Sequence, residues 1–141
     1  MAAESLLWAF LLINIAKMHE TFWTVALENV PFTNLLSRFV GYCGAGLYEE
    51  VLFRLLLLPA FMWLLRRCGV TPIFAAVSAV FMTSVLFSAA HYVGPLGEPL
   101  HLYSFTFRTL AGVFFSTLFL TRGFGVTAGS HATYDLLVGL I

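Results

Sequence analysis

The stretch YEEVLFRLLLLP, from Tyr48 to Pro59, places two adjacent carboxylates and an arginine inside an otherwise apolar run. The stability of a helix does not require charges there. In a membrane, each charged side chain at bilayer depth costs at least about 2.5 kcal/mol, so each one is a candidate for a functional role. The composition of the whole chain decides whether a membrane is the right setting.

That composition is typical of a membrane protein. Of the 141 residues, 60% are hydrophobic and only 10% are charged, whereas roughly a quarter of the residues in an ordinary soluble domain are charged. So few charges cannot cover a water-facing surface, and one small core cannot hide fifteen phenylalanines. We therefore expect an all-α, polytopic transmembrane helical bundle whose surroundings are the lipid bilayer.

Charge and cysteine content exclude other classes of protein. Seven basic residues balance seven acidic ones, and no basic patch is present, so we expect no nucleic-acid partner. Cys43 and Cys68 are the only cysteines, and two alone make neither a disulfide framework nor a zinc knuckle.

About five hydrophobic segments approach or exceed the roughly 20 residues that a helix needs to cross a bilayer. The N-terminal part, 1–34, contains a short hydrophobic segment and an interfacial stretch at 18–33. The core, 35–141, carries the other segments. Their approximate bounds are 5–16, 34–65, 72–93, 102–120 and 126–141.

The second hydrophobic segment contains the charges quoted above. Glu50 and Arg54 lie four residues apart and share a helical face, so they can neutralise one another. Glu49 is rotated from Glu50 by about 100° and points elsewhere. Small residues just upstream allow another helix to approach closely at this depth; they are Gly41, Gly44, Ala45 and Gly46.

Two further segments contribute ionisable residues with the same spacing. FSAAH places Phe87 and His91 on one face, and HATYD places His131 and Asp135 on one face. Taken singly, each pattern has a structural explanation, such as an ion pair between helices or a histidine at a helix end. Because three apolar segments each contain ionisable residues with this spacing, we expect these residues to form one shared site. Arg108, in the fourth segment, can snorkel, pair with an acid or contact a substrate carboxylate.

In this order, EEVLFR, FSAAH and HATYD resemble the motifs of the CPBP intramembrane proteases, which are EExxxR, FxxxH and HxxxN or HxxxD. That family comprises type II CAAX prenyl endopeptidases and their abortive-infection and bacteriocin-processing relatives. The resemblance covers residues 40–141, and it implies that this core is an intramembrane protease.

The resemblance also implies roles for individual residues. Glu49 would activate water, with His91 as its partner in binding water or metal, and Arg54 would orient the pair of Glu49 and Glu50. His131 and Asp135 would hold a metal or stabilise the oxyanion. Eukaryotic prenyl proteases resemble this pattern with Asn at the last position, and an ionised Asp cannot donate a hydrogen bond to an oxyanion, which favours metal ligation by Asp135.

Two chemistries fit these residues. One is a catalytic zinc with an open position for water, whose candidate ligands are Glu49, His91, His131 and Asp135; Glu49 is then either a ligand or the base that acts on the bound water. The other is a metal-free mechanism in which a buried carboxylate acts as base and the imidazoles assist it.

The resemblance implies an integral membrane endopeptidase, in the plasma membrane of a prokaryote, that cleaves a lipidated or membrane-bound peptide, such as a prenylated CAAX sequence. Two alternatives stay open. Buried Glu, His and Asp residues also mark transporters and proton relays, and a non-catalytic scaffold or immunity protein could keep the motifs for packing. The substrate and the oligomeric state are open as well.

Straight parallel helices would place His91 and His131 at different depths, because His91 is far along its segment and His131 is only a turn or two into the next one. We therefore expect either irregular backbone that dips into the membrane around Gly123, Gly125 and Gly129, or a displaced third segment.

Overall fold

A computed structural model describes residues 2–20, 35–94 and 97–140 of the chain, and the described residues are helical with no strand. Most of the predicted interfacial stretch, 21–33, lies outside them. In chain order the elements are α1 (Ala2–Glu20), α2 (Leu35–Glu50), the π-helical segment η1 (Val51–Leu57), α3 (Leu58–Arg67), α4 (Pro72–Ala90), α5 (Leu102–Arg122) and α6 (Phe124–Leu140).

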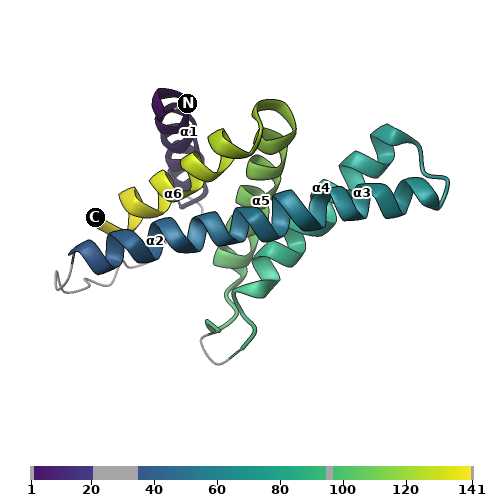
Figure 1. Ribbon diagram of the computed structural model, residues 1–141. Coiled ribbons are helices and arrows are strands. Elements are labelled where there is room, and N and C mark those ends of the chain that lie inside the picture. The colour runs from purple at the N-terminus through teal and green to yellow at the C-terminus, as the bar shows by residue number, and fades with distance from the viewer. Residues whose placement is uncertain (1, 21–34, 95–96, 141) are drawn as a thin grey trace.

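The elements α2, η1 and α3 follow one another without a break and form one long helix, so the described chain consists of five helical rods (Figure 1). This confirms the all-α fold with five hydrophobic segments. Pro59 explains why the middle of the long helix is π-helical. It lacks an N–H, and the N–H of Leu58 just before it donates to the carbonyl of Phe53, five residues back, as in a π-helix.

Two of the described helices are long and apolar enough to cross a membrane. They are α4, with 19 residues and a mean hydropathy of 2.1, and α5, with 21 residues and a mean hydropathy of 1.2. Only 33% and 28% of their most apolar windows are buried inside the protein. A core helix of a soluble protein would be mostly buried, whereas here large apolar side chains such as Ile73 and Phe81 face outward, as contact with lipid requires.

The helices pack in two connected groups (Figure 1). Helix α4 lies against α5 and α3, while α6 lies against both α1 and α2. The long helix runs across α5 and links the two groups. Glu49, Glu50 and Arg54 lie near the middle of this long helix, and they therefore face helices of both groups.

The turn between α5 and α6 is made by one residue. Gly123 has φ of 83°, a conformation that favours glycine, and its N–H donates to the carbonyl of Phe119 at 3.0 Å. Helix α6 then starts at once and leaves α5 in a new direction (Figure 1). Of the irregular backbone predicted around Gly123, Gly125 and Gly129, only Gly123 departs from helical geometry. The prediction was wrong for Gly125 and Gly129, because both lie within the regular helix α6. The change of direction at Gly123 removes the need for it.

Glycines allow two close helix contacts near the site. A Cβ on Gly112 of α5 would lie 2.8 Å from both Cα and Cβ of Ser84 in α4, and a Cβ on Gly46 of α2 would lie 3.3 Å from the backbone nitrogen of Ala132 in α6. The predicted close approach is thus confirmed at Gly46. It is wrong for Gly41 and Gly44, where no described atom lies within 4 Å of the Cβ position.

We predict that Gly112→Ala destabilises the protein by about 1–3 kcal/mol, because the added methyl group forces α5 away from the backbone of α4. Gly41→Ala is the matched control: it adds the same methyl group at a position in α2 where no described atom lies within 4 Å, and we expect unchanged or slightly higher stability. Reversible unfolding in mixed detergent micelles measures both. Equal stabilities of the two variants would contradict the close contact.

Candidate active site

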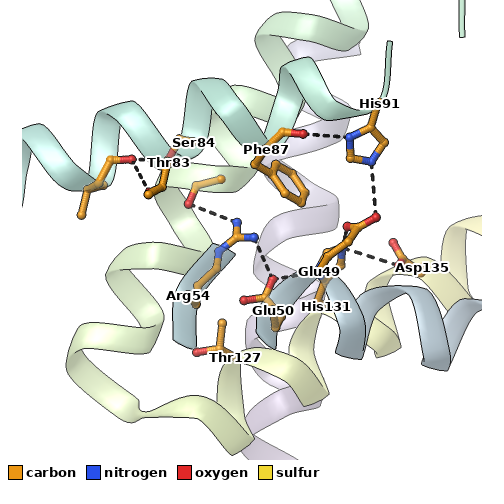
Figure 2. Close-up of polar contacts among 12 residues, drawn as sticks. Glu49, Glu50, Arg54, Thr83, Ser84, Phe87, His91, Thr127, His131 and Asp135 are labelled. Atoms are coloured by element: carbon orange, nitrogen blue, oxygen red, sulfur yellow. Dashed lines mark hydrogen bonds and ion pairs between the residues drawn. The ribbon is translucent and has the colours of Figure 1, made fainter. Parts of the chain in front are cut away.

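The structure brings together all six ionisable residues that the sequence analysis selected (Figure 2). They come from three parts of the chain that are distant in sequence: Glu49 and Glu50 at the end of α2, with Arg54 in the following η1; His91 directly after α4; and His131 and Asp135 in α6. One shared location was predicted, and it is observed.

Glu49 lies between the two imidazoles. Its Oε1 is 3.6 Å from Nε2 of His91, and its Oε2 is 3.6 Å from Nε2 of His131. Asp135 reaches the same nitrogen of His131, with Oδ2 at 3.5 Å. The side chains of Glu49 and His91 are 23% and 24% exposed, whereas that of His131 is 6% exposed. Glu49 and His91 therefore form the accessible part of the site, and His131 its buried part.

The other ring nitrogen of each histidine is held by an oxygen atom. Nδ1 of His91 lies 2.9 Å from the carbonyl oxygen of Phe87, which only accepts, so Nδ1 carries the hydrogen. Nδ1 of His131 lies 2.7 Å from Oε1 of Glu50 and donates to that carboxylate. Nε2 is consequently the ring nitrogen of each histidine that faces Glu49.

Glu50 and Arg54 form a fully buried ion pair, with exposures of 0% and 1% and a distance of 3.2 Å between Oε1 and Nη1. This confirms the predicted pairing. Arg54 also donates through Nη2 to the carbonyl of Gly112 at 3.4 Å. Within the described chain, Oε2 of Glu50 and Nε of Arg54 have no hydrogen-bond partner. The pair fixes the end of α2 against α5, and through Glu50 it also orients His131.

Two phenylalanines surround these groups. Phe115 of α5 stacks on the His131 ring with centroids 4.5 Å apart and planes at 21°. Phe87 of α4 meets the rings of His91 and His131 edge-on, and the guanidinium of Arg54 lies 4.4 Å from its centroid. The sequence analysis noted the spacing of Phe87 but assigned it no role, and it missed Phe115, because nothing in the sequence separates that residue from the other phenylalanines.

A cavity of about 280 Å³ opens onto Glu49, His91, His131 and Asp135. Helix α5 supplies much of its remaining wall, including Ser104, Arg108 and Phe115. A larger hollow of about 510 Å³ lies along α3, but its lining shares no residue with the cluster and contains no carboxylate or histidine. The smaller cavity is therefore the candidate active site, and Arg108 belongs to its wall.

The arrangement of these donors agrees only in part with the predicted zinc site. Both histidines donate Nδ1–H to an oxygen, as metal-binding histidines commonly do. A catalytic zinc, however, takes three protein ligands, and in the described part of the chain no three His, Cys, Asp or Glu side chains gather closely enough to hold an ion together. The zinc site stays a prediction, and we derive no catalytic step through it.

We predict that Arg54→Met lowers the free energy of unfolding by about 3–5 kcal/mol, because it leaves the Glu50 carboxylate buried without its cation. The double variant Glu50→Gln with Arg54→Met should recover most of this loss, since neither charge remains. A double-mutant cycle by unfolding in mixed micelles measures the coupling. Strictly additive losses would show that the two side chains do not depend on each other.

Comparison with known families completes the description of the site. The model of the family "Type II CAAX prenyl endopeptidase Rce1-like" matches residues 2–137, nearly the whole chain. The comparisons with curated proteins and with solved structures found no match. The family agrees with the three motifs and with the apolar helices α4 and α5. The chain belongs to the Rce1-like type II CAAX prenyl endopeptidases, and it is an integral membrane protease of that kind.

Proposed function

We propose that the protein hydrolyses a peptide bond near the C-terminus of a membrane-associated, prenylated CAAX-type substrate, and that Glu49 is the base that activates water. The observation that carries this proposal is the position of Glu49, partly exposed to the cavity and 3.6 Å from Nε2 of each of two imidazoles. We also propose that the protein resides in the plasma membrane of a prokaryote.

In the proposed reaction, a water molecule bound by Glu49 and His91 attacks the substrate carbonyl carbon. Glu49 takes one proton as the new C–O bond forms, and the carbonyl oxygen becomes an oxyanion. When the C–N bond breaks, that proton passes to the leaving amine. His91 is suited to receive a hydrogen bond from the water, because its Nδ1–H is already used by the carbonyl of Phe87.

His131 is the proposed stabiliser of the oxyanion, acting as an imidazolium. Carboxylates on both sides of its ring favour the cation: Glu50 at Nδ1, and Glu49 and Asp135 near Nε2. Its Nε2–H would then donate to the developing negative charge. Asp135, which as an ionised acid cannot donate, would hold the imidazolium in place. Arg54 and Glu50 are positioning residues, since they act through His131 and the end of α2.

We predict that Glu49→Gln lowers kcat by at least about 10²-fold with little change in KM, because the amide keeps the shape of the side chain but cannot take a proton. Cleavage of a prenylated CAAX peptide by the detergent-purified protein, followed by mass spectrometry, measures this. Glu4→Gln is the control, as Glu4 pairs with Arg122 and lies outside the cavity. A Glu49→Gln variant with full kcat would rule out Glu49 as the base, whereas peptide binding without cleavage by the parent protein would favour a scaffold.

A metal-free mechanism predicts that cleavage survives exhaustive treatment with a strong chelator. It also predicts that the purified protein contains no stoichiometric zinc by elemental mass spectrometry. The comparison variant combines His91→Ala with His131→Ala. About one zinc per chain in the parent, lost in this variant, would contradict the metal-free mechanism and place a metal among the four predicted ligands.

A further inference from the structure

Arg108 is a charged residue of the cavity wall to which the proposed chemistry assigns no task. It is the seventh residue of α5, a helix long and apolar enough to cross a membrane, and its side chain is 22% exposed. Within the described lining of the cavity, it is the only side chain with a permanent positive charge. The buried arginine of the site, Arg54, is already neutralised by Glu50.

The guanidinium of Arg108 holds a carboxylate in a fork. Its Nη1 donates to Oε2 of Glu98 at 2.9 Å, and its Nη2 donates to Oε1 at 2.8 Å. Two parallel N–H···O bonds of this kind are the characteristic way in which arginine recognises a carboxylate group. The position in front of Arg108 is therefore a carboxylate site, and Glu98 occupies it.

Glu98 is the more exposed partner of this pair. Its side chain is 52% exposed, so water can solvate its carboxylate when it leaves the fork. The hydrogen bonds from Arg108 lower the pKa of Glu98, so the carboxylate is ionised at neutral pH. Another carboxylate that forms the same fork could replace that of Glu98 at little cost in stability.

The orientation of Arg108 does not depend on Glu98 alone. Nη1 also donates to the Tyr92 hydroxyl at 3.3 Å, and the guanidinium lies 5.6 Å from the centre of the Tyr92 ring. That hydroxyl is in turn 2.8 Å from Oγ of Ser104. Tyr92 directly follows His91, so the residues that hold Arg108 adjoin the proposed catalytic group.

We propose that Arg108 binds the free C-terminal carboxylate of the peptide substrate, and that Glu98 takes this position when no substrate is bound. The inference rests on the proposed function, because it names the end of the peptide that this cavity receives. Arg108, Glu49 and His91 line one small cavity. Anchoring the chain terminus at Arg108 therefore sets how far from that terminus the bond is cleaved.

The test measures binding by the full chain in detergent, with Glu49→Gln present throughout so that turnover does not interfere. The probes are two prenylated CAAX peptides that differ only in ending as a free acid or an amide. We expect the acid to bind about tenfold or more tightly than the amide, because a hydrogen bond between two charged groups is stronger than one to a neutral amide. Arg108→Gln should weaken binding of the acid to the level of the amide and leave the amide unaffected.

Three further variants sharpen the result. Arg108→Lys keeps the charge but loses the fork, so it should restore only part of the preference for the acid. Glu98→Gln removes the competing carboxylate and should tighten binding of the acid at least about twofold. The reason is that a larger fraction of the protein then has Arg108 free to bind the peptide, which raises the apparent affinity. Arg122→Gln, at the far end of the same helix and paired with Glu4, should retain the parent preference.

Equal binding of acid and amide by the protein with intact Arg108 would overturn the proposal. So would an unchanged acid-to-amide ratio in Arg108→Gln, because it would mean that Arg108 only supports the fold. Failure of the proposed function gives a different result: the protein with Glu49 restored would cleave neither peptide while the Arg108-dependent preference persisted. Cleavage of both peptides without a preference would contradict the proposed carboxylate site but would agree with the proposed protease function.

Discussion

The buried ion pair between Glu50 and Arg54 is the constraint on which the site depends. Replacing such a pair by apolar residues is often neutral or stabilising, so stability alone does not explain its presence. The pair instead joins elements that carry the chemistry. Arg54 reaches the Gly112 carbonyl of α5 and the Phe87 ring of α4, while Glu50 reaches His131 of α6. Four helices are thereby held around one buried pair of charges.

Two adjacent glutamates can do different work because consecutive helical residues point in directions about 100° apart. Glu50 is fully buried and paired, whereas Glu49 reaches the cavity. The helix becomes π-helical directly after them, over Val51–Leu57, and such segments are frequent at functional sites. Glu49 thus stays accessible to the cavity, while Glu50 is fixed by its contacts. Because the two residues are adjacent in the helix, the fixed position of Glu50 also determines where Glu49 lies.

The charged part of this site could be predicted from the sequence, because charges are rare in apolar helices and each one demands a partner. The spacing of Glu50 and Arg54 identified their pair. The contact of Glu50 with His131, 81 residues away, could not be predicted, since it depends on the turn at Gly123 and the new direction of α6. Phe115 was equally hidden, because a phenylalanine in an apolar helix needs no special explanation.

The negative and positive charges around the cavity lie at different parts of its lining. Glu49 and Asp135 place negative charge at one part of its lining, while Arg108 places the permanent positive charge of the described lining at another. A peptide terminus that carries a carboxylate is repelled by the first and attracted by the second, and a low local dielectric strengthens both effects. In the proposed reaction, the same charges would both activate water and align the substrate, because only one orientation brings its carboxylate to Arg108 and a peptide carbonyl to Glu49.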